Sequence, residues 1–159
     1  MNQESIAASI VKLTDTSSTL RALLDGMDVM KMRVKPNPAL FSPLEDAWHL
    51  RDIEREGYLV RIRRILTEDV PVLEDLDGDR LAIERRYNER ELAPAIDDFA
   101  CARAESLTLL KDLPADAWAR RAQFANHTIN QRALIDMMVE HDHGHLSSIR
   151  AIYVTASAA

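Results

Sequence analysis

The chain has 159 residues, of which 47% are hydrophobic and 29% are charged, a composition typical of a globular protein with a sizeable core. Its formal net charge of −6 excludes the dense Lys and Arg surface that general nucleic-acid binding requires. A single cysteine excludes an intrachain disulfide, and no apolar segment approaches the length needed to cross a bilayer, so we expect one cytoplasmic domain over residues 1–159.

The first expected helix lies within residues 4–27, where apolar residues recur at helical spacing. Inside it, the polar run Asp15-Thr16-Ser17-Ser18 predicts either a break or a restart through a new cap. A connector with two prolines follows over residues 28–41. The second helix has the clearest start in the sequence, because Ser42-Pro43-Leu44-Glu45 is a capping box with proline at the first helical position. We expect this helix to continue to about Leu66.

Residues 67–88 form a long acidic connection that contains the turn signal Asp77-Gly78-Asp79, and we expect it to cross one end of a bundle. The third helix is expected over about residues 89–113. The residues predicted to lie near one stripe of it are Leu92, Ile96, Phe99, Arg103, Ser106 and Leu110. Residues 114–129 are expected to be irregular or to contain one short turn. After them, Asn130 predicts the cap of a fourth helix that ends near Thr155. The chain is therefore expected to be all-α, with a four-helix bundle.

The fourth expected helix carries the run His141-Asp142-His143-Gly144-His145. At about 100° per residue, His141 and His145 share one stripe, while His143 falls among the solvent-facing residues. The other members of this stripe are apolar: Leu134, Met138, Ile149 and Ile152. Each buried neutral imidazole keeps one donor and one acceptor that must be satisfied. A pair at positions i and i+4 aims two ring nitrogens at one point, and a metal ion at that point would bind both nitrogens.

His49 is the only histidine of the second expected helix, on a stripe with Ile53, Glu56 and Val60. If the second and fourth helices pack together, His49 meets His141 and His145, and three imidazoles can then hold a divalent ion with positions left open for water or substrate. Zn²⁺, Ni²⁺ and Fe²⁺ all suit imidazole, and the spacing does not choose among them. The alternative is a core in which these histidines only form hydrogen bonds.

Carboxylates near the histidines are candidates for orienting them, because metal-bound histidines usually donate their other N–H group to a carboxylate or a carbonyl. Asp52 and Glu56 are the candidates from the second helix, with Asp52 expected to orient His49, and Asp142 is the candidate from the fourth. For Glu56, an ion pair with Arg63 or a position facing water is the alternative. The metalloprotease motif His-Glu-x-x-His is absent because Asp142 stands in place of the glutamate, so a protease-like general base is not predicted.

The stretch 48–54, Trp-His-Leu-Arg-Asp-Ile-Glu, followed by His141-Asp142-x-x-His145-Leu146, resembles the DinB-like and YfiT-like family of metal-binding four-helix bundles. The resemblance covers residues 20–152. It implies up-down-down-up connectivity with long crossover connections, and a divalent metal ion held by His49, His141 and His145. One departure is the stretch 40–43, Leu-Phe-Ser-Pro, which keeps the serine but not the tryptophan of the family's Gly-Lys-Trp-Ser-like start, so the local pocket wall differs.

The relatives include thiol-dependent S-transferases and a maleylpyruvate isomerase linked to glutathione or mycothiol, and dimers are common among them. The leading hypothesis is therefore a metal-dependent transferase that lowers the pKa of a low-molecular-weight thiol and presents the thiolate to a small electrophile. The expected partners are a small-molecule substrate and a second copy of the chain, with no nucleic acid and no membrane. The alternatives are a non-catalytic stress-related bundle that binds a metal or another ligand, and a structural zinc that joins two helices with Asp52 or Glu56 as fourth ligand.

Overall fold

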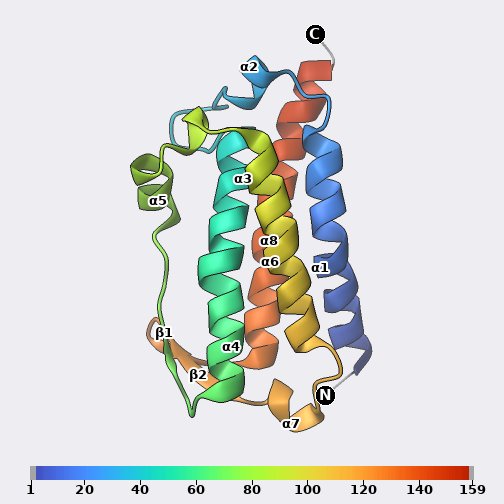
Figure 1. Ribbon diagram of the computed structural model, residues 1–159, viewed down its shortest axis with the longest axis vertical. Helices are drawn as coiled ribbons and strands as arrows, with labels where there is room; N and C mark the ends of the chain where they lie inside the picture. The colour runs from blue at the N-terminus through green and yellow to red at the C-terminus, as the bar shows by residue number, and fades with distance from the viewer. Residues whose placement is uncertain (1–2, 158–159) are drawn as a thin grey trace.

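The computed structural model describes residues 3–157, and its main feature is four long helices that lie side by side (Figure 1). Three of them are α1 (Gln3–Leu24), α6 (Leu92–Leu110) and α8 (Gln131–Ser157). The remaining one is continuous through three parts, α3 (Pro43–Asp52), the π-helical turn η1 (Ile53–Tyr58) and α4 (Leu59–Thr67). In Figure 1, α1 and α8 run upward while α3–α4 and α6 run downward, which confirms the four-helix bundle with up-down-down-up topology.

Local signals in the sequence set the helix ends. The Ser42 hydroxyl accepts a hydrogen bond from the Glu45 N–H at 3.2 Å, and the Glu45 carboxylate accepts one from the Ser42 N–H at 2.9 Å, which completes the predicted capping box. Asn130 accepts a hydrogen bond from the Ala133 N–H at 2.8 Å, as an N-cap does. The expected break at residues 15–18 is absent, and Thr16 instead donates a hydrogen bond to the Lys12 carbonyl within an unbroken α1.

The connections carry short elements, of which the sequence pattern allowed only one short turn within residues 114–129. The first holds α2 (Val29–Met32); the second holds β1 (Val72–Leu73), α5 (Gly78–Glu84) and the 3₁₀ helix η2 (Tyr87–Glu89); the third holds α7 (Ala115–Trp118), β2 (Arg121–Phe124) and β3 (His127–Asn130). The strands form one sheet in the order β1-β2-β3, with β1 parallel and β3 antiparallel to β2.

The expectation that the second connection crosses the end of the bundle is wrong. Because α3–α4 and α6 both run downward, this connection has to return from the lower end to the upper end, and Figure 1 shows it running along the side of the bundle. Its α5 contacts α3 on the way. A segment that sequence reasoning treats as a loop is thereby placed against the helix that carries His49.

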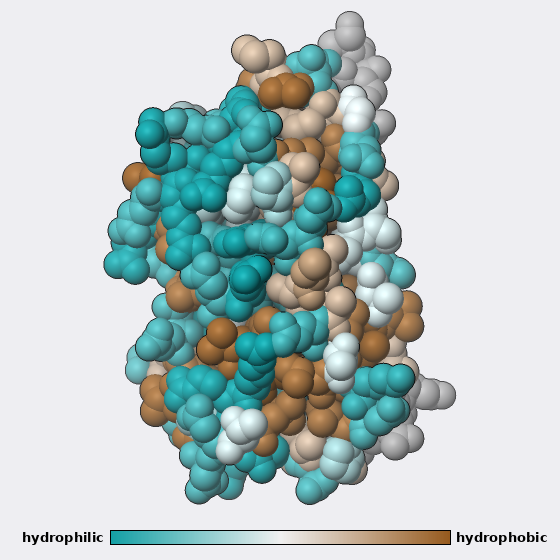
Figure 2. Space-filling model, viewed as in Figure 1, coloured by the Kyte–Doolittle hydropathy of each residue, from teal (hydrophilic) through white to brown (hydrophobic). Residues whose placement is uncertain are grey.

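The core consists of two apolar clusters, one built around Leu20, Leu50 and Phe99 and the other around Leu13, Ile62 and Leu134. Within the described residues, no helix is both long enough and apolar enough to cross a membrane. Figure 2 shows apolar residues gathered on the surface over the lower halves of α1 and α6. There they line a groove of about 710 Å³ that includes Ile6, Ile10, Val11, Leu107, Leu110 and Trp118. None of the five histidines lies among the residues that line this groove.

Candidate metal centre

His49 of α3 and the pair His141 and His145 of α8 come together where these two helices pack. The Nε2 atoms of His49 and His141 are 3.0 Å apart. The ring centroid of His145 lies 4.5 Å from the ring centroid of His49 and 4.6 Å from that of His141. One ring nitrogen from each of the three residues lies within 4.8 Å of the other two. His143 is exposed, on the opposite side of α8, as its position in the helical period predicts.

Burial favours the neutral form of two rings of the cluster, those of His49 and His141. Burial, together with the neighbouring His145 and His141, lowers the pKa of His49 to about 2. Burial also lowers the pKa of His141, against the opposing influence of Asp142. A neutral imidazole has a free electron pair on one nitrogen, and this is the form that ligates metals.

The distance between the Nε2 atoms of His49 and His141 fits a bound divalent ion. Two nitrogens that each lie about 2.0–2.1 Å from one zinc ion are roughly 2.9–3.4 Å apart when the coordination angle is between about 90° and 109°. The 3.0 Å between His49 and His141 falls within that range. The same distance also suits a hydrogen bond between two neutral rings, which is the metal-free alternative. The Nδ1 atoms of both rings are buried and have no hydrogen-bond partner among the described residues.

Asp46 is the carboxylate that contacts the cluster directly, and sequence reasoning missed it. Its Oδ1 atom lies 2.7 Å from Nδ1 of His145, and its side chain is 2% exposed. Burial raises the pKa of Asp46, while the neighbouring His145 and Ser148 oppose that rise. With Nδ1–H of His145 donated to this carboxylate, the lone pair of His145 is left on Nε2. The available signal was the position of Asp46, one helical turn before His49.

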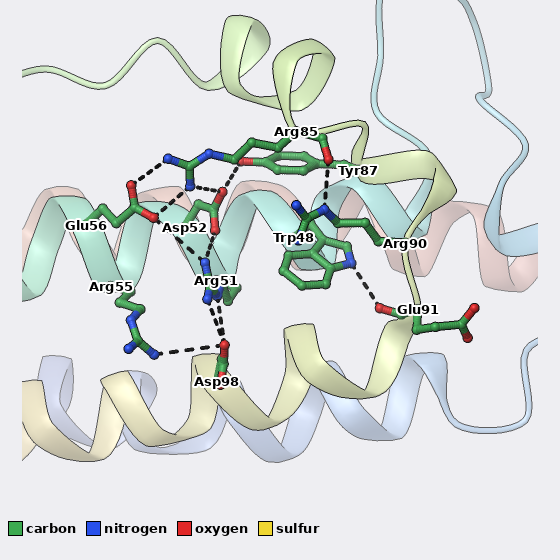
Figure 3. Close-up of polar contacts among 10 residues, drawn as sticks. All are labelled: Trp48, Arg51, Asp52, Arg55, Glu56, Arg85, Tyr87, Arg90, Glu91 and Asp98. Carbon is green, nitrogen blue, oxygen red and sulfur yellow. Dashed lines mark hydrogen bonds and ion pairs between the residues drawn. The ribbon is translucent and has the colours of Figure 1, made fainter.

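The predicted candidates Asp52 and Glu56 lie elsewhere, in the ion-pair cluster of Figure 3. Asp52 accepts hydrogen bonds from Arg51 and Arg85, each at 2.6 Å, and from the Tyr87 hydroxyl. Glu56 binds Arg85 through both of its oxygens, at 2.7 and 2.8 Å. The structure thus gives His49 no hydrogen bond to Asp52, and Glu56 pairs with Arg85 and not with Arg63. Both carboxylates instead hold the connection that contains α5 and η2 against α3.

The π-helical turn explains why the helical period misplaced Glu56. A π turn bonds residue i to residue i+5, so it adds one residue and rotates the following helix by roughly 100° relative to a regular α-helix. Glu56 and Val60 are therefore exposed, whereas Gly57 and Arg61 occupy the buried positions.

Asp142, the candidate from α8, belongs to a buried polar network. It accepts hydrogen bonds from Arg103 at 2.7 Å and from Thr16 at 2.9 Å. Arg103 also binds Glu54 at 2.9 Å, and Glu54 accepts a further hydrogen bond from Ser106 at 2.6 Å. The second carboxylate oxygen of Asp142 lies 3.8 Å from Nδ1 of His141. The network joins all four long helices directly beside the histidine cluster.

Gly78, at the start of α5, packs against the His49 ring. A Cβ atom at this position would lie 2.3 Å from Cε1 and 2.7 Å from Nδ1 of His49. Only glycine allows such a close approach of the backbone to the ring. The sequence marked Gly78 as part of a turn, and the structure gives it a second role in fixing the place of His49.

A cavity of about 440 Å³ opens beside His141 and His145. Its other walls come from the segment before α3, with Leu40 and Phe41, and from α5, with Asp79. The Phe41 ring lies 5.1 Å from that of His49 and is stacked on His145 at 6.2 Å. The stretch that departs from the family's sequence pattern therefore supplies an aromatic wall to the site.

Comparisons with known proteins agree with this architecture. The solved structure of YfiT from Bacillus subtilis, described as a probable metal-dependent hydrolase with an unusual four-helix bundle topology, matches with a TM-score of 0.92. The match covers 99% of this chain and 90% of that one at 16% sequence identity, so it shows a common fold. No curated protein matches the chain. The family model of the DinB superfamily matches residues 12–149, which include all three clustered histidines, and the chain belongs to the DinB superfamily.

Proposed function

We propose that the chain is a divalent-metal-dependent enzyme acting on a small molecule, with His49, His141 and His145 as the metal ligands. The observation that carries this proposal is the convergence of three imidazoles beside an open cavity, with the Nε2 atoms of His49 and His141 3.0 Å apart. Three protein ligands leave at least one coordination position for water or substrate, as in catalytic sites.

A bound ion would supply Lewis-acid chemistry, which lowers the pKa of a thiol or a water molecule that binds it. The protein's own residues prepare the site. Asp46 holds His145 in the tautomer that leaves Nε2 free, and Gly78 allows the backbone of α5 to cover His49. Phe41 shields one side of the cluster from solvent. No described residue that lines the cavity is a cysteine, and the one serine there, Ser148, neighbours the Asp46 carboxylate. We therefore expect the nucleophile to come from a bound small molecule.

For the reaction, we propose transfer of a low-molecular-weight thiol to a small electrophile, as in the thiol-dependent relatives that the sequence resembles. Hydrolysis is the second candidate, supported by the description of the structurally similar YfiT. Both reactions use the same three ligands and differ in the nucleophile. A cytoplasmic location, a single domain and a homodimer stay predictions from the sequence.

The test begins with elemental analysis of protein purified without added metal and without a metal-affinity tag. We expect about one divalent ion per chain in the wild type, and less than about a tenth of that in His141→Ala. His143→Ala is the matched control, because it removes an exposed histidine from the same helix and should keep the metal. An equal metal content in His141→Ala and His143→Ala would refute the ligand assignment.

Turnover is then measured with a panel of thiols and monochlorobimane, and in parallel with a panel of small esters and amides. Activity that requires His141 but not His143 supports a metal-dependent enzyme, and the active panel decides between transferase and hydrolase. Metal binding without turnover in either panel would favour the non-catalytic binding protein. A sharp fall of the melting temperature on chelation, with no exchangeable water on the ion, would favour the structural zinc.

A further inference from the structure

His141 has less polar support for the orientation of its ring than His145 has. The Nδ1 atom of His145 lies 2.7 Å from the Asp46 carboxylate. The Nδ1 atom of His141 is buried without a hydrogen-bond partner among the described residues, and a carboxylate oxygen of Asp142 is 3.8 Å away. A metal-ligating histidine is usually oriented by a hydrogen bond from its second nitrogen. The orientation of the His141 ring therefore depends more on packing than that of His145 does.

Tyr58, the last residue of η1, packs against the His141 ring. The two ring centroids are 5.7 Å apart and the ring planes are inclined at 65°, which is an edge-on arrangement. Aromatic rings attract each other in this geometry, and the attraction depends on their orientation. Phe41 contacts the rings of the other two clustered histidines, so Tyr58 completes the aromatic surroundings of the cluster.

The Tyr58 ring is itself held in place. Tyr58 is 5% exposed, and the guanidinium group of Arg61 lies over its ring, 5.5 Å from the centroid. Arg61 donates two hydrogen bonds to the Glu74 carbonyl, at 3.0 and 2.8 Å, in the connection that leads to α5. The Tyr58 hydroxyl has no hydrogen-bond partner in the part of the chain that the structure describes. The contacts of this side chain are therefore made by its ring and not by its hydroxyl.

The π-helical turn brings Tyr58 to the side of the helix that faces the cluster. Tyr58 follows His49 by nine residues, which in a regular α-helix turn about 900° and place the two side chains on opposite faces. The extra residue of η1 removes about 100° of that rotation, so Tyr58 lies about 80° from the direction of His49. The same turn that moves Glu56 away from the cluster thus moves Tyr58 toward it.

We propose that Tyr58 is a positioning residue of the metal centre, whose ring fixes the His141 ring in the orientation that aims its Nε2 atom at the metal. The proposal rests on the proposed function for the metal ion, and it adds a residue that acts on the ion through one of its ligands. Without the ring of Tyr58, His141 gains rotational freedom that metal binding has to remove, which lowers the affinity. The hydroxyl has no part in this role, so phenylalanine should replace tyrosine.

The test uses four variants of the full chain. Tyr58→Met and Tyr58→Leu remove the ring but keep an apolar side chain, and both are made so that the failure of one to fold leaves the other. Tyr58→Phe keeps the ring. Trp118→Leu is the matched control, because it removes a ring from the same apolar cluster on α7, at the lower end of the bundle (Figure 1). Each protein is titrated with Co²⁺, and the affinity and the visible absorption spectrum of the bound ion are measured, since the spectrum depends on ligand geometry.

We expect the two ring-free variants to bind Co²⁺ about tenfold more weakly than the wild type, which is the lower end of the effect of groups that orient metal-bound histidines. Their Co²⁺ spectra should also change, because the ligand geometry is no longer fixed. Tyr58→Phe should keep the wild-type spectrum and an affinity within about twofold. Trp118→Leu should lower the melting temperature but leave the spectrum and the affinity unchanged.

The proposal is overturned if a folded ring-free variant keeps the wild-type spectrum and affinity, or if Tyr58→Phe loses as much affinity as the ring-free variants do. The metal-free protein gives a separate readout through the nitrogen NMR signals of its histidine rings. His141 should give one sharp set of signals in the wild type and a broadened or doubled set in the ring-free variants, and identical signals would also overturn the proposal. A wild type that binds no metal would refute the proposed function, while the NMR signals would still decide whether Tyr58 fixes the His141 ring.

Discussion

The buried arginine at the centre of the bundle is the position where a single substitution should have the largest effect. Arg103 is 1% exposed and pairs with Glu54 at 2.9 Å and Asp142 at 2.7 Å. The change Arg103→Ala leaves two buried carboxylates without a cation, and breaking a buried ion pair in this way costs about 3–5 kcal/mol. This is a large part of the roughly 5–15 kcal/mol by which a domain is stable.

The measurement is urea unfolding followed by circular dichroism, with the free energy of unfolding extrapolated to water. The matched control is Arg21→Ala, because Arg21 binds Asp97 at 2.6 Å but both side chains are exposed, at 48% and 65%. An exposed pair contributes at most about 1 kcal/mol, so the two variants should differ by about 3 kcal/mol. The nitrogen–oxygen distances are similar, but Arg103 binds two buried carboxylates whereas Arg21 binds one exposed carboxylate.

A third variant keeps the reasoning testable if Arg103→Ala does not fold. Replacing the whole network by neutral side chains of similar size, Arg103→Met with Glu54→Gln and Asp142→Asn, leaves no unpaired charge and should recover most of the lost stability. If Arg103→Ala is no less stable than Arg21→Ala, the buried network contributes nothing through its charges. A triple variant less stable than Arg103→Ala would equally refute the argument from unpaired charge.

Three further predictions concern the histidine cluster. Gly78→Ala should weaken metal binding at least about tenfold in a metal titration, because the new Cβ would lie 2.3 Å from the His49 ring. The control is Gly144→Ala, whose Cβ meets nothing within 4 Å. Equal metal affinities in the two variants would contradict the contact between Gly78 and His49. Asp46→Ala should weaken metal binding about 10–100-fold in the same titration, since His145 loses its acceptor, and wild-type affinity would show that this contact does not matter. The metal-free protein should lose stability as pH falls below about 6.5, because a folded-state pKa of about 2 for His49 makes the unfolded chain bind the proton. His49 contributes about 1.4 kcal/mol per pH unit to the slope in urea unfolding, and the slope of His49→Gln should be smaller by that amount because His141 still contributes. Identical slopes in the two proteins would reject the burial of a neutral His49 ring.

The sequence predicts those parts of the molecule that depend on local pattern. Helix starts at Ser42 and Asn130 follow from side chains that satisfy free N–H groups within a few residues. The pair His141 and His145 follows from the helical period, and the meeting with His49 follows once two helices are assumed to pack. Asp46 was missed because its contact with His145 depends on the rotation of α3 relative to α8, which periodicity does not contain. The small sheet was missed because strands of two to four residues carry too few residues to show an alternating pattern.

Asp52 and Glu56 lie at the π-helical turn and act on the site through the connection that contains α5. The turn places Glu54 in the buried network with Arg103, and Glu56 on the outer face with Arg85. Arg85 belongs to the connection that continues from α5, and Asp52 holds the same connection through Arg85 and Tyr87. That anchoring keeps α5 against α3, where Gly78 covers His49 and Asp79 reaches the cavity. Asp52 and Glu56 therefore affect the histidine cluster by positioning its cover, so their removal should loosen α5 before it changes the ligands themselves.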